Sequence, residues 1–142
     1  MLDTRFHDVS DKIVRSIDKV GAGGEIVVST FTLNDRAFLD SLRAAQERGV
    51  SVVLYVEATA KLPAEAYELG SAIKRVSMPH GIQHDKTVVC HENGSYKTYY
   101  GSANRTCGHN SVDQVFLTQS AEFGSNHMQK LHDMLAPYVQ KQ

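Results

Sequence analysis

The residues best suited to chemistry lie between His84 and Asn104. His84 and Lys86 are two positions apart, and residues i and i+2 of a β-strand point to the same face of a sheet. A nucleophile and a fixed cation would then share one surface. One hairpin later, the segment Gly101-Ser102-Ala103-Asn104 adds a hydroxyl and an amide. Together these groups suit a phosphate ester, because an imidazole can attack phosphorus while the others bind its oxygens.

The same residues resemble the signature of the phospholipase D superfamily, H-x-K-x4-D followed by G-S-x-N. The matching residues are His84, Lys86, Gly101, Ser102 and Asn104. His91 stands where the family has an aspartate, and we expect the adjoining Glu92, rather than His91, to make any compensating hydrogen bond near the site. The resemblance covers most of the chain and includes an acidic residue, Asp113, after the second half-motif.

This resemblance implies a mechanism in which one histidine attacks phosphorus and a second protonates the leaving alcohol, before water hydrolyses the phosphohistidine. The chain has a single H-x-K, so the resemblance implies a homodimer in which the two His84 side chains face each other across a two-fold axis. Lys86 would neutralise the phosphate and Asn104 would donate hydrogen bonds to it. Ser102 would bind phosphate or hold the histidine, and Asp113 would fix the imidazole tautomer.

The substrate and its contacts are predicted from the same resemblance. The predicted substrate-binding residues are Gly101, Arg105 and Thr30. No metal or other cofactor is expected, because the cationic groups belong to the chain itself. Nucleic acid is the first expected substrate, since short single-motif members of the superfamily include nucleases, and a phospholipid is the second. A third hypothesis is a nucleic-acid-binding relative whose catalysis is impaired by the change at His91.

The hydrophobic pattern indicates the elements that must position these residues. Apolar residues recur at helical spacing from about Asp3 to Val20, and Glu25–Phe31 is a β-branched run typical of a buried strand. A helix over Asp35–Arg48 then leads to a strand over Val50–Val56. Strand, helix and strand with short joints predict a parallel βαβ unit. The inner face of this second helix is predicted to be Phe38, Leu39, Leu42 and Ala45.

In the later part of the chain, apolar and polar residues alternate less regularly. We expect a short helix over Pro63–Leu69, strands over Ile73–Met78 and about Val112–Thr118, and a closing helix over Asn126–Tyr138. The inward residues of the closing helix are predicted to be Met128, Leu131, Met134 and Leu135. The predicted fold is α/β and phospholipase D-like: a single domain over residues 1–142, with a mixed, mostly parallel β-sheet flanked by helices.

The hairpin between the two half-motifs raises a problem of register. Asn93-Gly94 is the strongest short hairpin signal in the chain, and a strict two-residue turn there places Gly101 opposite Lys86. Cross-strand partners share a face, so Ser102 and Asn104 would then fall on the wrong side. Either the loop has an odd length or a bulge, or the chain leaves the strand at Gly101. We prefer the second alternative.

Composition limits the class of protein only loosely. With a net charge of −1, the chain has no overall basic excess for binding phosphates. Seven cationic residues could still form a local basic patch. These are Arg36, Arg43, Arg48, Lys74, Arg75, Lys97 and Arg105. No run of about 18 apolar residues and no secretory signal is visible, so membrane insertion is not expected. Cys90 and Cys107 form no C-x-x-C pair, and reduced thiols in a cytoplasmic protein are the expectation.

A zinc site is the rival hypothesis for the histidines and cysteines. The candidate ligands are His80, His84, Cys90, His91, Cys107 and His109. Their spacings fit no standard zinc motif, and Cys90 and His91, as neighbours on a strand, would point to opposite faces. We therefore favour the phosphate site.

Overall fold

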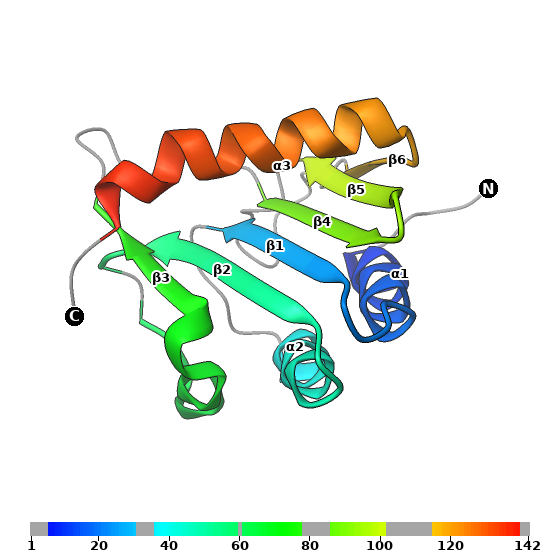
Figure 1. The fold of residues 1–142 in the computed structure, drawn as a ribbon. Coiled ribbons are helices and arrows are strands. Elements are labelled where there is room, and N and C mark those ends of the chain that lie inside the picture. Colours follow the sequence, from blue (N-terminus) through cyan, green and yellow to red (C-terminus); the bar gives the residue numbers. More distant parts are fainter. Residues whose placement is uncertain (1–5, 31–35, 60, 78–85, 102–114, 140–142) are drawn as a thin grey trace.

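The computed structural model describes residues 6–30, 36–59, 61–77, 86–101 and 115–139, which build a six-stranded sheet in the order β3-β2-β1-β4-β5-β6 (Figure 1). The strands are β1 (Glu25–Thr30), β2 (Ser51–Glu57), β3 (Ile73–Val76), β4 (Lys86–Glu92), β5 (Ser95–Gly101) and β6 (Val115–Thr118). The α-helices are α1 (Phe6–Asp18), α2 (Arg36–Glu47) and α3 (Ala121–Leu135), and the 3-10 helices are η1 (Ala64–Ala72) and η2 (Ala136–Tyr138).

The sheet is mixed, as the sequence predicts, and β1 is where its two halves meet. On one side β1 pairs in parallel with β2, and β2 with β3, which confirms the predicted βαβ unit. On the other side β4, β5 and β6 are all antiparallel to their neighbours. The expectation that most strands would be parallel is therefore wrong for the described strands, because only those joined by the crossovers through α2 and η1 are parallel.

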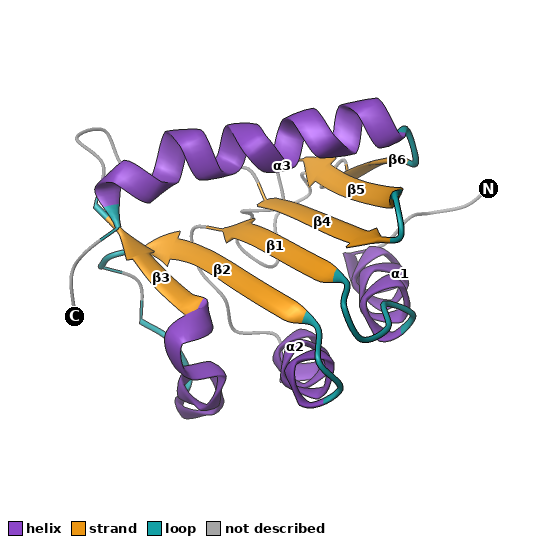
Figure 2. Ribbon diagram, viewed as in Figure 1, coloured by secondary structure: helices purple, strands orange, loops and turns teal. Residues whose placement is uncertain are grey.

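Helices cover both faces of the sheet (Figure 2). α1, α2 and η1 lie on one face, where Ile26 and Val28 of β1 are buried, and α3 lies on the other, where Val27 is buried. β1 therefore has apolar contacts on both sides, which explains why its sequence reads as a continuous apolar run rather than an alternating one.

The inner faces of the helices follow their apolar spacing. Phe38, Leu39, Leu42 and Ala45 of α2 are buried, as predicted. α2 ends before Gly49, whose φ of +95° is one that residues with a side chain rarely adopt. α1 turns Ile13 and Ile17 inward at a spacing of one helical turn.

The closing helix differs from its prediction in three respects. α3 begins at Ala121 rather than Asn126, because the Ser120 hydroxyl accepts a hydrogen bond of 3.1 Å from the backbone N–H of Phe123 and caps the helix. Met134, predicted to point inward, is 41% exposed. The buried residues Met128, Leu131 and Leu135 form a single stripe, and Met134 lies about 100° away from Leu135 around the helix. α3 also ends at Leu135, short of the predicted Tyr138, because Pro137 cannot continue the helix, and a 3-10 turn follows.

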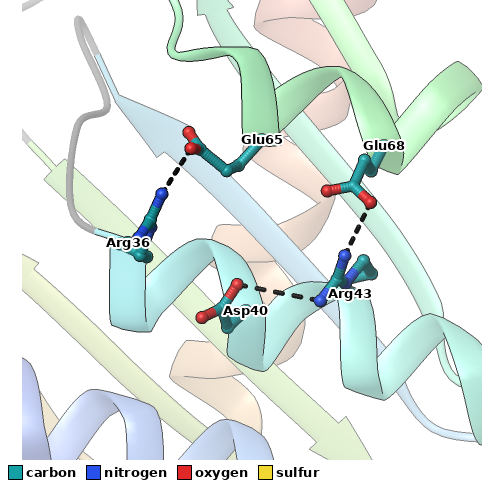
Figure 3. Close-up of polar contacts among 5 residues, drawn as sticks. All are labelled: Arg36, Asp40, Arg43, Glu65 and Glu68. Atoms are coloured by element: carbon teal, nitrogen blue, oxygen red, sulfur yellow. Dashed lines mark hydrogen bonds and ion pairs between the residues drawn. The ribbon is translucent and has the colours of Figure 1, made fainter.

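Charged side chains join α2 to η1 on the molecular surface (Figure 3). Arg36 binds Glu65 at 2.6 Å, and Arg43 binds Glu68 at 2.7 Å. The hydrogen bond from Arg36 lowers the pKa of Glu65. Water screens such exposed pairs, so they orient η1 more than they stabilise it. The glutamates of η1 thus form a solvated surface.

The contact between α3 and β5 gives a test of this packing. A Cβ atom added to Gly124 would lie 2.5 Å from Cβ of Tyr96. Alanine in place of glycine normally stabilises a helix by about 1 kcal/mol, but at this position we expect Gly124→Ala to destabilise the fold by about 1–3 kcal/mol through overpacking. Urea unfolding measures the difference, with Ser125→Ala on the exposed side as the control. An unchanged or higher stability of Gly124→Ala would contradict the packing.

Candidate functional site

The ends of several strands meet at one edge of the sheet (Figure 1). β1 ends there at Thr30, and its parallel neighbour β2 ends there at Glu57. β4 runs in the opposite direction and begins there at Lys86, while β5 returns to the edge and ends at Gly101. Three predicted site residues, Thr30, Lys86 and Gly101, therefore belong to adjacent strands at a single edge.

The remaining predicted site residues lie outside the described residues. They are His84, Ser102, Asn104, Arg105 and Asp113. In the sequence His84 is two residues from Lys86, and Ser102 directly follows Gly101. Their roles stay predictions.

The hairpin between the half-motifs resolves the register problem as far as β5 extends. Its turn has two residues, Asn93 with φ of +52° and Gly94 with φ of +80°, as in the turns that suit twisted strands. The pairing continues without a bulge until Lys86 lies opposite Gly101. The odd-loop or bulge alternative is thereby excluded for the described pairing. The path of the chain after Gly101, on which the preferred alternative depends, lies outside the described residues and stays a prediction.

Buried hydroxyl groups support this edge from within the sheet. Thr30 is 4% exposed, and Ser29 and Thr87, which lie directly opposite each other, are each 5% exposed. A side chain as buried as that of Thr30 is better suited to positioning neighbouring residues than to touching a substrate. Contact between Thr30 and a substrate stays a prediction that this burial does not favour.

Glu57 is a residue at this edge that the sequence analysis missed. Its Oε2 atom is buried and has no hydrogen-bond partner among the residues that the structure describes. Unpaired buried carboxylate oxygens are costly and uncommon, and they are retained mainly where they serve a function. An acidic residue directly after a buried parallel strand was the available signal, because ligands of α/β sheets bind at the carboxyl ends of such strands.

The family follows from comparison with known proteins. A family model described as "Cardiolipin synthase, PLD-like domain" matches residues 14–134, which is most of the chain. The chain belongs to this phospholipase D-like family. No match was found among curated protein sequences.

Solved structures share the phospholipase D-like fold at low sequence identity. Nuc from Salmonella typhimurium, a phospholipase D family member, is 16% identical with a TM-score of 0.71, and the match covers 92% of this chain and 88% of that one. Polyphosphate kinase from Porphyromonas gingivalis is 19% identical with a TM-score of 0.61, covering 89% of this chain and 21% of the kinase. The archaeal chromatin protein TrmBL2, whose structure shows a novel mode of DNA binding, is 10% identical with a TM-score of 0.57, covering 89% of this chain and 48% of TrmBL2.

His91, which replaces the aspartate of the phospholipase D-like motif, lies toward the opposite end of β4 from Lys86. The two residues are five apart, or about 17 Å along a strand. His91 Nε2 accepts a hydrogen bond from the N–H of Gly94, so Nδ1 carries the proton that it donates to Glu25 at 2.9 Å. The ring also stacks on Tyr96, with centroids 4.1 Å apart. These contacts hold the hairpin to β1. The position at which His91 replaces the motif's aspartate is therefore far from the edge where Lys86 and Gly101 lie.

The prediction that Glu92 compensates near the site is wrong. Glu92 is the last residue of β4, six positions from Lys86, and its carboxylate lies against Gly21 beyond the end of α1. The prediction relied on Glu92 being next in sequence to His91, which occupies the motif's acidic position. That position belongs to the turn end of the hairpin.

The zinc hypothesis gains no support from the residues that the structure describes. Cys90 is buried on the α1 side of the sheet, and burial raises the pKa of its thiol to about 12. A protonated thiol is a poor metal ligand. Within the described ranges no three histidine, cysteine or acidic side chains come together as a metal site. The candidates His80, His84, Cys107 and His109 lie outside those ranges.

Most arginines proposed for a basic patch already bind partners within the fold. Arg36 and Arg43 pair with η1, and Arg48 donates hydrogen bonds to the carbonyls of Val20 and Ile17 at the end of α1. Arg75 binds the carbonyl of Ala58. Lys74 and Lys97 form no ion pair with other described residues, and Arg105 lies outside them. In the part of the chain that the structure describes, no helix is both long and apolar enough to span a membrane.

The remoteness of His91 can be tested by restoring the family residue. His91 lies directly opposite Glu25, so His91→Asp would place two carboxylates side by side and should destabilise the hairpin by up to about 1 kcal/mol. Phosphodiester turnover should not rise, because the position is far from Lys86. His91→Asn, which adds no charge, is the matched control. A large gain of turnover in His91→Asp would show that the position acts on the site.

Proposed function

We propose that this chain is a metal-independent phosphodiesterase, and specifically a nuclease that forms a phosphohistidine intermediate. The observation that carries the proposal is the unbroken hairpin register that makes Lys86 and Gly101 direct partners at the edge where β1 and β2 end. The first half-motif therefore leads into this edge and the second leads out of it. The match to a phospholipase D-like family model over residues 14–134 supports the same reading.

His84 is the proposed nucleophile. Its imidazole attacks phosphorus, the P–O bond to the leaving alcohol breaks, and a second imidazole gives that oxygen a proton. Water then attacks the phosphohistidine and releases the phosphomonoester and the free histidine. Lys86 and Asn104 hold the non-bridging oxygens, and Ser102 and Asp113 orient the site. Because these cations and donors belong to the chain, no metal is required.

The second imidazole is proposed to come from a second copy of the chain. The sequence contains one H-x-K, whereas the mechanism uses one histidine for attack and one for protonation. A two-fold axis through the site would supply both, since residues facing such an axis meet their own copies. The active form is therefore a homodimer.

Nucleic acid is the proposed substrate class. TrmBL2, which has the same fold, binds DNA, and this supports nucleic acid over other phosphodiesters. The description of the matching family as cardiolipin synthase supports a phospholipid as the second candidate. Incubation with single- and double-stranded DNA, RNA and phospholipid vesicles, with EDTA present and His84→Ala as control, separates the two and identifies a relative that only binds.

The shared site predicts a bell-shaped pH profile and a specific behaviour of mixed dimers. One imidazole must be neutral and the other protonated, and the two titrate as a coupled pair. A dimer of one wild-type and one His84→Asn subunit should still cleave a nitrophenyl ester, whose leaving group needs no proton. It should cleave natural phosphodiesters about 100–10,000-fold more slowly, which is the usual contribution of a general acid.

Two controls accompany the mixed dimers. Lys86→Ala should impair both substrates, because both carry the phosphate charge, and EDTA should change neither rate. If mixed dimers cleave natural substrate at half the wild-type rate or faster, each subunit has a complete site of its own and the shared-site account is wrong.

A further inference from the structure

A cavity of about 400 Å³ lies on the α1 side of the sheet, where the end of α1 meets the turn of the β4–β5 hairpin. This volume is within the usual range of small-molecule pockets. The lining residues include Ser16, Lys19 and Val20 from α1 and its end, and Cys90, Glu92 and Lys97 from the hairpin.

The cavity is separate from the catalytic edge. Glu92 is six residues from Lys86 along β4, or about 20 Å. Tyr99, which follows Lys97 on the same face of β5, is 6% exposed, and its hydroxyl is hydrogen-bonded to Ser16 Oγ at 2.6 Å. This contact between α1 and β5 closes the cavity in the direction of the catalytic edge. A ligand of the cavity must therefore be a compact molecule that ends there.

The charged side chains of the cavity have no partner in the part of the chain that the structure describes. Lys19, Lys97 and Glu92 form no ion pair or hydrogen bond with residues of that part. Two ammonium groups and one carboxylate leave the cavity with a net positive charge. The charge of Lys97 reaches the Cys90 thiol, where it opposes the rise in pKa that burial causes. Both lysines are therefore available to an anion in the cavity.

The two signs of charge in the cavity define the groups that a ligand needs. Ammonium groups are common ligands of phosphate, and a phosphomonoester carries enough negative charge to engage both Lys19 and Lys97. Glu92 repels an anion, and its ionised carboxylate only accepts hydrogen bonds. A ligand that brings a donor beside its phosphate satisfies Glu92, whereas phosphate alone does not. Val20 and the protonated thiol of Cys90 offer an apolar surface to the rest of the molecule.

We propose that this cavity binds a small phosphomonoester that also carries hydrogen-bond donors, with the phosphate held by Lys19 and Lys97 and a donor directed to Glu92. Nucleoside monophosphates and glycerol phosphate share this chemistry, the first through amino and hydroxyl groups and the second through hydroxyl groups alone. The cavity is a binding site in addition to the proposed phosphodiesterase site, and it does not depend on that function.

The test is isothermal titration calorimetry of the full chain in EDTA with adenosine monophosphate, glycerol phosphate and inorganic phosphate. At least one of the two phosphomonoesters should bind more tightly than inorganic phosphate. Lys19→Gln and Lys97→Gln should each weaken that binding by about five- to tenfold. Lys61→Gln and Lys130→Gln, exposed lysines that do not line the cavity, are the matched controls and should leave it unchanged.

Two further variants assign the binding to the cavity. Lys86→Ala removes the cation of the catalytic edge and should leave the affinity unchanged, because the cavity lies at the other end of β4. Glu92→Gln should tighten the binding of inorganic phosphate by removing a repulsive charge. It should also reduce the preference for the phosphomonoester, because an amide oxygen is a weaker acceptor than a carboxylate.

Several results would overturn the proposal. They are absence of binding by both phosphomonoesters, tighter binding of inorganic phosphate, losses in the lysine variants no larger than in the controls, an unchanged preference in Glu92→Gln, and a loss in Lys86→Ala equal to that in Lys97→Gln. The measurement is of binding alone. A chain that cleaves no phosphodiester would therefore refute the proposed function and still give a decisive result for the cavity.

Discussion

β1 is hydrogen-bonded to a parallel strand on one side and to an antiparallel strand on the other, with apolar side chains buried on both of its faces. This position brings the carboxyl ends of β1 and β2 to the same edge as the start of β4. A slip of one residue in either pairing would turn a set of core side chains to the wrong face. Ile26, Val27 and Val28 are all at most 2% exposed, so neither pairing has freedom to slip.

The second constraint is the length of the hairpin turn. Two residues with positive φ join β4 to β5, and the strict register that follows separates the hairpin into two ends with different roles. At the turn end His91, Glu25 and Tyr96 hold β4 and β5 to β1. At the other end lie Lys86 and Gly101, which are themselves residues of the phospholipase D-like motif. His91, which stands at the position of the motif's aspartate, belongs to the turn end, five residues from Lys86.

The sequence was a good guide wherever structure depends on local spacing. The parallel pair β1–β2, the buried face of α2 and the Asn93-Gly94 turn all follow from periodicity or turn chemistry over a few residues. The start of α3 was missed because a single hydroxyl, that of Ser120, caps it ahead of its apolar stripe. The proportion of antiparallel strands was missed because it depends on how β4 meets β1, which are far apart in sequence.

Only those residues of the candidate site that belong to a recognisable motif could be predicted from the sequence. The buried carboxylate of Glu57 and the partners of Arg36, Arg43 and Arg48 depend on contacts between distant segments. No pattern in the sequence shows that an arginine will be occupied by a neighbouring helix rather than free for a ligand. The structure therefore changed the expected source of phosphate contacts more than it changed the fold.

The central claim is that a histidine at the edge formed by β1, β2, β4 and β5 becomes covalently bound to phosphorus. The most direct measurement is mass spectrometry of the chain mixed with a nitrophenyl phosphodiester in EDTA and quenched in alkali, which preserves phosphohistidine. The account predicts a transient phosphorylated peptide with the modification on His84. Turnover of the substrate without an adduct, or with an adduct on another residue, would contradict it.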